Sequence, residues 1–213
     1  MRVMIGTTVL LGLLASADVG RAAVITFTSR AAWDAAVGDS ALYTFNADAP
    51  GSFTSRDFGA FTVSESGIDL SLAIATGAAG TQIDATNHLV LAEGGTPFPT
   101  TEPATFAFDT PIFAFGFDWR TIDLSDDGLD LVLNGVLFSV SPGAPASGFF
   151  GIVSTDPILS FALQDDEDGG GLNQGVGVDN LSYSVTAVPE PTSLLLLGTG
   201  LLGAGIRRYR RRP

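Results

Sequence analysis

The chain has 213 residues, with 23 Asp and Glu, ten Arg, no Lys and no Cys, and its formal net charge is −13. The absence of cysteine excludes disulfides and thiolate chemistry, and the acidic balance disfavours binding to nucleic acid or anionic lipid. Within residues 23–187, three Arg face 21 acidic residues, a difference of −18. This excess favours a solvated surface and, as a second interpretation, binding of divalent cations.

The first 22 residues have the pattern of a secretory signal peptide. Arg2 supplies the positive start, an apolar stretch follows over residues 3–17, and small residues stand at positions −3 and −1 of a cut after Ala22. A cut after Ala17 is the alternative. We therefore expect export through the Sec machinery, with residues 1–22 forming an apolar helix that is absent from the mature protein.

The mature chain is predicted to open with a strand and a short helix. Val24–Phe27 is rich in β-branched residues, and Ser29 can cap a helix that runs through four alanines to Val37. Trp33 and Val37 share one face of this helix because they are four residues apart. Trp33 is therefore expected to be a core anchor rather than a platform for a ligand.

After Val37 the pattern is one short strand after another. Residues 113–119 alternate aromatic with small or polar side chains, which is the period of two that a strand requires. Asn134-Gly135 lies between two apolar runs and predicts a two-residue hairpin, because both residues tolerate positive φ. The predicted strands are Ala41–Phe45, Phe58–Ser64, Asp69–Ala75, His88–Ala92, Pro103–Phe108, Ile112–Trp119, Leu129–Leu133, Val136–Val140, Phe149–Val153, Ile158–Leu163 and Gly177–Val185.

This succession of short strands predicts an all-β fold. Gly, Pro, Asn and Asp separate the strands, and no long apolar stretch of helical period follows the first helix. We expect residues 23–187 to form a single antiparallel β-sandwich, jelly-roll-like, with one short N-terminal helix. The signal peptide helix precedes this domain, and an apolar C-terminal segment follows it.

The C-terminal 26 residues combine three features in a fixed order. A Pro-Glu-Pro spacer comes first, and a Leu- and Gly-rich run over Leu194–Ile206 follows it. As a helix this run of 13 residues would span about 20 Å, short of a hydrocarbon core of about 30 Å. A basic cluster that favours the cytoplasmic side ends the chain. The spacer residues are Val188, Pro189, Glu190 and Pro191, and the basic cluster is Arg207, Arg208, Arg210, Arg211 and Arg212.

In this order and at this position, the three features resemble the PEP-CTERM sorting signal. The resemblance implies export by a Gram-negative bacterium, many of which make extracellular polysaccharide, and cleavage near Pro-Glu-Pro by a membrane-embedded exosortase. Residues 188–213 are then a sorting signal whose short transmembrane helix anchors the protein in the inner membrane only transiently. An ordinary tail anchor is the alternative, and the shortness of the apolar run disfavours it.

Two segments of the domain resemble parts of other proteins that carry this signal. We call Phe27–Trp33 the opening motif, because it is similar to the start of many such proteins. Phe149–Tyr183, which ends in the closing motif Val178–Tyr183, resembles the last half of their sandwich domains. Those sandwiches are similar to carbohydrate-binding modules and lectins, some of which bind calcium. The resemblance identifies no sugar-binding residue.

Carboxylates suggest a calcium site near the C-terminal end of the domain. Calcium takes six to eight oxygen ligands at flexible spacing, which acidic loops can supply. Asp165, Asp166 and Asp168 precede three consecutive glycines, and Asp179 could complete the site if the strand ends meet. The alternative is a solvated loop with a strand-end Asp in turn hydrogen bonds.

The sequence contains no recognisable catalytic motif. His88 is the single histidine, it is expected at the surface or on an edge strand, and no Gly-x-Ser-x-Gly is present. Zinc would require further His or Cys ligands. A glycoside hydrolase needs only two well-placed carboxylates, so it remains the weakest alternative. We therefore expect that the protein is not an enzyme and that it requires no cofactor.

The expected function is therefore that of an exported protein of the cell envelope or extracellular matrix, processed by an exosortase. It would act as a non-enzymatic binding module with polysaccharide as its ligand and calcium as an optional ligand. Tyr43, Phe98 and Phe150 are candidate stacking residues for sugar rings. The alternative is a structural surface or biofilm matrix protein without a specific ligand.

Overall fold

The computed structural model describes residues 23–65, 70–76, 81–93, 103–121, 128–140, 147–166 and 175–187. The predicted signal peptide, the sorting signal, Phe98 and Asp168 lie outside these residues. In chain order the elements are β1 (Val24–Phe27), α1 (Arg30–Val37), β2 (Ala41–Tyr43), the 3-10 helix η1 (Phe45–Ala47), β3 (Gly51–Phe53), β4 (Ser55–Asp57), β5 (Phe61–Glu65), β6 (Leu70–Thr76), β7 (Asn87–Glu93), β8 (Ala104–Thr121), β9 (Gly128–Leu133), β10 (Val136–Ser139), β11 (Ser147–Asp166) and β12 (Gly175–Ser184).

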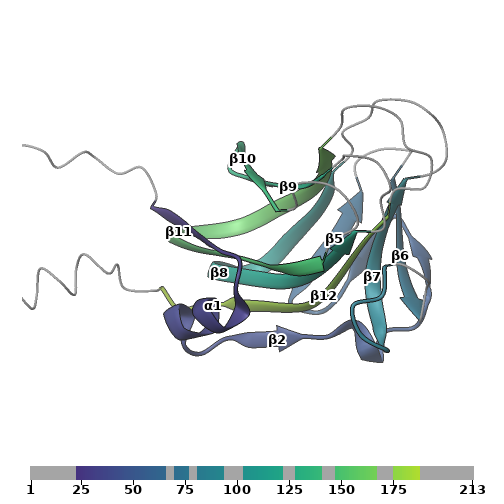
Figure 1. Cartoon of the computed structure of the whole chain (residues 1–213), viewed down its shortest axis with the longest axis horizontal. Helices are drawn as coiled ribbons and strands as arrows, with labels where there is room; N and C mark the ends of the chain where they lie inside the picture. The colour runs from purple at the N-terminus through teal and green to yellow at the C-terminus, as the bar shows by residue number, and fades with distance from the viewer. Residues whose placement is uncertain are drawn as a thin grey trace, which may run out of the picture.

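Two long antiparallel strands, β8 and β11, form the spine of the fold. They pair from Ala104 opposite Leu163 to Arg120 opposite Ser147, with register shifts between Val153 and Ser160. The sequence analysis divided each of them into two strands at an internal proline. In the structure both strands bend at this irregular region and return across the molecule (Figure 1). Proline cannot donate to the ladder, so it fits a place where the pairing is interrupted.

The bend divides one continuous antiparallel sheet into two layers. The hairpin layer contains β4, β5, residues 104–108 of β8, residues 160–166 of β11, β9 and β10. The helix layer contains β1, residues 147–154 of β11, residues 112–121 of β8, β12, β2, β7, β6 and β3. The prediction of an antiparallel all-β domain with one helix is confirmed. Its two layers belong to a single sheet rather than to two, and the jelly-roll order stays a prediction.

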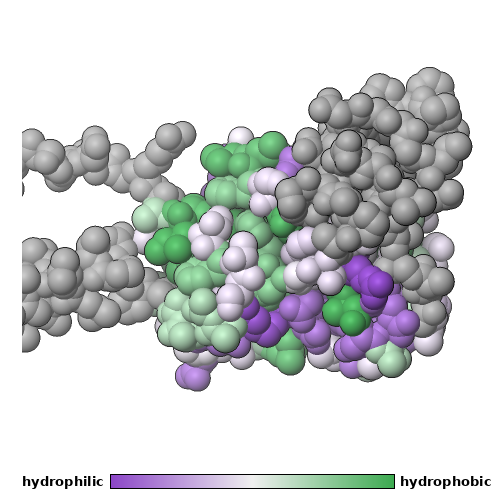
Figure 2. All heavy atoms as spheres, viewed as in Figure 1, coloured by the Kyte–Doolittle hydropathy of each residue, from purple (hydrophilic) through white to green (hydrophobic). Residues whose placement is uncertain are grey.

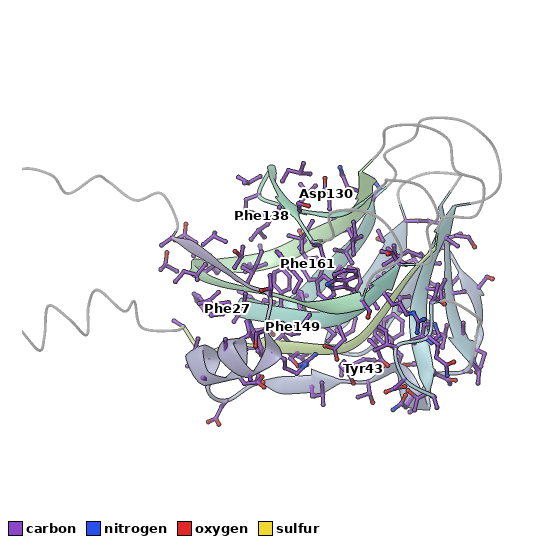
Figure 3. All side chains as sticks on the ribbon, viewed as in Figure 1. Phe27, Tyr43, Asp130, Phe138, Phe149 and Phe161 are labelled. Carbon is purple, nitrogen blue, oxygen red and sulfur yellow. The ribbon has the colours of Figure 1, made fainter. Side chains whose placement is uncertain are left out.

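Aromatic side chains fill the core between the layers. Phe161 of the hairpin layer stacks on Phe106 at 4.7 Å between ring centroids and on Phe115 of the helix layer at 4.0 Å. Phe115 pairs in register with Ile152 and Tyr183, so its contact with Phe161 crosses the space between the layers. Figure 3 labels Phe161 among the side chains of the core. Each such buried ring contributes on the order of 1.5–3 kcal/mol through the apolar surface that it removes from water.

The helix α1 covers the outer face of the helix layer. Trp33 is fully buried, and its indole N–H donates to the carbonyl oxygen of Ile152 at 3.2 Å. Gly151 makes room for it, because a Cβ there would lie 2.5 Å from the Trp33 ring, and its partner Gly116 makes room for the Phe149 ring. Trp33 is thus a core anchor, as predicted. Ser29 precedes the helix, but its side chain makes no capping hydrogen bond.

The hairpin of β9 and β10 forms where the sequence predicts it. Asn134 and Gly135 adopt φ of 52° and 75°, the left-handed conformation that a two-residue turn requires. Leu133 therefore pairs with Val136 across the turn. The short strands β3 and β4 were not predicted.

Both ends of the described domain lie on the same side of the molecule. The Ala23 backbone N–H donates to Thr155 Oγ1 at 3.1 Å, beside the bend of β11. Ser184, near the end of β12, pairs with Ala114, which in turn pairs with Val153 of β11. In Figure 1 the purple start of β1 and the yellow end of β12 accordingly face the same way, whereas β11 ends on the opposite side. Within the described residues, no helix has both the length and the apolar character needed to cross a bilayer.

Candidate functional site

The opening and closing motifs meet in a polar network on the outer face of the helix layer. Arg30 of α1 donates to Ser182 Oγ and to the carbonyl oxygen of Asn180, both at 2.9 Å. Its guanidinium also forms an ion pair with Asp118 of β8 at 3.1 Å. The same group lies 4.6 Å from the centroid of the Phe149 ring, a cation–π contact. Arg30 therefore fastens α1 to β8, β11 and β12 at once.

A bulge in β12 creates the geometry that Arg30 uses. Asp179 pairs with Asp118 and Ser182 pairs with Gly116, so β12 has one more residue than β8 in this interval. Asn180 takes up the extra length with φ of 50°, a conformation that Asn tolerates well. Its side-chain amide donates to Asp118 Oδ2 at 2.9 Å, so both carboxylate oxygens of Asp118 have partners.

Asp179 lies next to this network and is fully buried. The Asn180 backbone N–H donates to Asp179 Oδ1 at 2.7 Å, whereas Oδ2 has no hydrogen-bond partner among the described residues. Burial raises the pKa of Asp179 above its ordinary value, and the Asp84 carboxylate raises it further. Backbone hydrogen bonds from Asn180 and Phe45, together with the charge of His88, act against this rise and lower the pKa.

His88 is buried as well, which corrects the expectation of a surface or edge residue. Its strand β7 pairs on both sides, with β6 and with β12. Residues 81–86 cover it: His88 Nε2 lies 2.9 Å from Thr81 Oγ1, and Nδ1 lies 3.4 Å from the Thr86 carbonyl oxygen. A Cβ on Gly177 would lie 2.0 Å from the Thr81 carbonyl oxygen, so a side chain there would displace this cover. No pattern in the sequence indicated that residues 81–86 cover His88.

The network is suited to holding elements together. Asp118 is bonded to Arg30 and Asn180, Asp179 accepts one hydrogen bond from the Asn180 backbone, and Thr81 and Ser182 are occupied in hydrogen bonds. Within the described residues, no group of three or more His, Asp or Glu is arranged to hold a metal ion. Asp118, Asn180 and Arg30 were not singled out as a group from the sequence, although Arg30 and Asn180 belong to the two noted motifs.

The described residues place the predicted calcium ligands in both layers of the fold. Asp165 and Asp166 close β11 opposite Leu129 and Gly128 of β9, in the hairpin layer. Asp179 lies within β12, in the helix layer, and β8 separates β12 from β11. The side chains of Asp165 and Asp166 and the whole of Asp168 are outside the described residues, so calcium binding by these three stays a prediction.

Two of the three candidate stacking residues lie in the described part of the chain, and neither is a free aromatic surface. Phe150 is only 3% exposed and belongs to the core, so its prediction as an exposed ring is wrong. Tyr43 is half-buried, and its hydroxyl donates to Asp48 Oδ2 at 2.8 Å. Burial and this carboxylate raise the pKa of Tyr43 to about 12. In Figure 3 the Tyr43 ring points toward the core from the end of β2.

Residues 187–212 match the PEP-CTERM protein-sorting motif. The match confirms the tail that the sequence analysis placed at residues 188–213. It implies an exported protein that an exosortase processes and that has a membrane-anchoring C-terminal tail. The motif begins at Ala187, where the described domain ends.

Comparison with curated protein sequences finds no match to this chain. Among solved structures, a mutant of the carbohydrate-binding module CBM29-2 complexed with mannohexaose is similar at 12% identity and a TM-score of 0.42, covering 72% of this chain and 98% of the module. A mutant described as a carbohydrate-binding module of family 29 has 13% identity and a TM-score of 0.41, covering 70% of this chain and 95% of the module. A third structure, of a family 29 carbohydrate-binding module, has 12% identity and a TM-score of 0.38, covering 73% and 97%.

Proposed function

We propose that this protein is a non-enzymatic binding module of the cell envelope or extracellular matrix, with polysaccharide as its ligand. The observation that carries the proposal is the junction between domain and sorting motif. The motif begins at Ala187, and Ala23 leaves the domain on the same side (Figure 1). While the tail is held in the membrane, this side faces the bilayer and the opposite side is presented outward.

The charge of the domain restricts the kind of polysaccharide. Three Arg face 21 acidic residues over 23–187, and two of these Arg, Arg30 and Arg56, form ion pairs inside the fold. An anionic polysaccharide would be repelled unless a divalent cation bridged it to the protein. The ligand is therefore a neutral glycan, or an acidic one that binds together with calcium.

Calcium would bind at the end of β11, away from the tail. Asp165, Asp166 and Asp168 supply hard oxygen ligands next to three glycines that allow the backbone to turn. β11 ends at Asp166 on the side opposite Ala23 (Figure 1). Asp179 is left out of this proposal because its carboxyl group is fully buried and its raised pKa disfavours the anion that calcium prefers.

The sorting role of the tail is tested by deleting residues 188–213 and by measuring the intact mass of the exported chain. We expect the native protein to begin at Ala23 and to end near the Pro-Glu-Pro spacer, and the truncated chain to be missing from the surface. Unchanged surface delivery of the truncated chain would rule out the sorting role.

The ligand class is tested on an array of neutral and acidic glycans, with calcium and with a chelator. We expect binding to neutral glycans in both conditions, or to acidic glycans with calcium only. No binding in either condition would reject a polysaccharide ligand. Calcium-dependent self-association without any glycan preference would favour the structural matrix protein instead.

A further inference from the structure

We propose that the end of the domain from which the tail leaves carries an apolar patch, which rests on the headgroup region of the bilayer while the tail is anchored. The inference rests on the membrane-anchoring tail of the proposed function. The patch consists of Ile25 of β1, Leu159 at the bend of β11 and Val185 after β12, which are 41%, 60% and 55% exposed. We call these three residues the tail-side patch. Figure 2 shows hydrophobic surface on the left, over the start of β1 and the bend of β11.

The strand pairing places Ile25 and Val185 at the same end of the sheet. Ile25 pairs with Val153 of β11, and Val153 pairs with Ala114 of β8. Ala114 also pairs with Ser184, the residue before Val185. Three steps between neighbouring strands separate Ile25 from Ser184, which amounts to about 15 Å. The two exposed side chains therefore belong to one region of the surface.

Leu159 belongs to this end because it lies in the bend. Its neighbour Ile158 pairs with Ile112, two residues from Ala114. Single exposed apolar side chains are ordinary in soluble proteins, whereas several at one place mark an interaction surface. Six large apolar side chains are exposed among the described residues, and half of them form the tail-side patch. The other three are Leu42 of β2 and Val136 and Leu137 of β10.

The tail identifies the bilayer as the partner of the patch. The sorting motif begins at Ala187, two residues after Val185, and its apolar run begins at Leu194. Leu194 is nine residues after Val185, so the chain between them can extend over at most about 30 Å. The patch is therefore held within reach of the membrane surface whenever the tail is inserted. Apolar side chains at such a surface enter the boundary between headgroups and acyl chains.

Two exposed carboxylates at the bend restrict the depth of the contact and the kind of lipid. Asp109 and Asp156 lie on the bent segments of β8 and β11. A carboxylate is costly to remove from water, so these side chains keep the domain at the level of the headgroups. Anionic headgroups would repel them. The surface that fits the patch is therefore a zwitterionic bilayer.

A quencher carried by lipid tests the contact, since the chain has no cysteine of its own. The full chain is exported in a host without an exosortase, so that it keeps its tail, and is reconstituted into phosphatidylcholine vesicles that contain nitroxide-labelled lipid. A fluorophore on Leu159→Cys should be quenched at least about threefold more than one on Ser147→Cys. Ser147 is the matched control, because it is exposed and begins β11 eight residues, or about 26 Å, before Thr155 at the bend.

Substitutions in the patch separate contact with lipid from tethering by the tail. In the chain labelled at Leu159→Cys, the pair Ile25→Asp and Val185→Asp should lower quenching to the level of the Ser147→Cys label. Leu42→Asp is the control, because Leu42 is 59% exposed and lies outside the patch, and it should leave the quenching unchanged. Equal quenching of the two labels, or quenching that the paired substitutions do not alter, would overturn the proposal.

A label on Leu196→Cys, within the apolar run of the tail, distinguishes failure of the patch from failure of the anchor. Quenching at Leu196→Cys without quenching at Leu159→Cys would reject the patch and leave the anchoring tail of the proposed function in place. No quenching at Leu196→Cys would mean that the tail does not enter the bilayer, and both the anchor and the patch would then be wrong.

Discussion

Arg30 connects the beginning of the domain to its end. Its partners Asn180 and Ser182 are separated from it by about 150 residues of sequence, and Asp118 lies between them in the chain. A planar guanidinium can serve three acceptors and an aromatic face simultaneously, which an ammonium group cannot do in the same geometry. The half-buried position of the group keeps these bonds from being fully screened by water.

We expect Arg30→Ala to lower the free energy of unfolding by about 1–3 kcal/mol, because it leaves acceptors on Asp118, Asn180 and Ser182 without their donor. Arg120→Ala is the matched control, since Arg120 is exposed and donates one hydrogen bond to the Gln82 carbonyl oxygen. Arg120→Ala should lower the free energy of unfolding by less than about 1 kcal/mol. Urea unfolding of both variants checks this, and equal losses would contradict the role of Arg30.

Asp179 gives the domain a pH dependence of its own. The folded state retains this proton above pH 3.8, the ordinary pKa, whereas the unfolded chain releases it. The free energy of unfolding therefore falls as the pH rises from 3.8 through the raised pKa of Asp179. Asp179→Asn should reduce this slope by up to about 1.4 kcal/mol per pH unit, the effect of one proton.

Denaturant unfolding between about pH 4 and 8 measures that slope. Asp109→Asn serves as the comparison, because Asp109 is exposed at the surface of β8. If both variants keep the native slope, Asp179 does not release its proton on unfolding in this range.

Some residues of this network could be predicted from the sequence and others could not. The burial of Trp33 was expected from its place on an apolar face of a short helix. The burial of His88 was not, because it depends on β7 lying between two strands and on the cover of residues 81–86. No local pattern around a single histidine records such neighbours.

At the scale of elements, local chemistry predicted the hairpin and the helix, whereas long-range geometry set the rest. Asn134-Gly135 fixes its turn through the φ angles of two residues. In β8 and β11 the prolines Pro111 and Pro157 were interpreted as strand ends, but the strands bend there and continue. β8 and β11 stay continuous through the bend because they pair with each other on both sides of it. Sequence periodicity alone could not show this long-range pairing.

The contact between α1 and the sheet depends on glycine. Gly151→Ala should destabilise the domain by about 1–3 kcal/mol, because the new Cβ would lie 2.5 Å from Trp33 and 2.9 Å from Phe149. Trp33→Ala alone should cost about 3–5 kcal/mol through the cavity that it leaves. In the Trp33→Ala background, Gly151→Ala should cost less, since only the conflict with Phe149 remains. Strictly additive losses in a double-mutant cycle would contradict this packing.

At the scale of the whole molecule, the sorting tail was the most predictable part of the chain. Its information is a linear order of a spacer, an apolar run and a basic cluster, which needs no tertiary contact to be recognised. The ligand of the domain is not encoded in this way. It depends on which side chains the fold brings together at the surface. Phe150 was expected to be an exposed aromatic ring, but it lies in the core.

The acidic surface predicts a response to salt and a separate response to calcium. Screening between about 10 mM and 500 mM NaCl should raise the Tm, by roughly 2–4 °C for each kcal/mol of repulsion removed. Calcium at millimolar concentration should raise the Tm further than NaCl of the same ionic strength if the end of β11 binds it. Asp165→Asn together with Asp166→Asn should abolish this additional rise. Identical curves for calcium and matched NaCl would argue against a specific site.

The pairing of β1 with β11 has consequences for the order of folding during export. Val24 pairs with Ser154, and Arg30 of α1 needs Asn180 and Ser182 of β12 as hydrogen-bond acceptors. A chain that crosses the membrane with its N-terminus first therefore emerges without the partners of its first two elements. Since contacts of such long sequence separation form slowly, the emerged segment stays incompletely folded until almost the whole domain has crossed. The last strand ends at Ser184, three residues before the sorting motif, so completion of the fold coincides with arrival of the tail at the membrane.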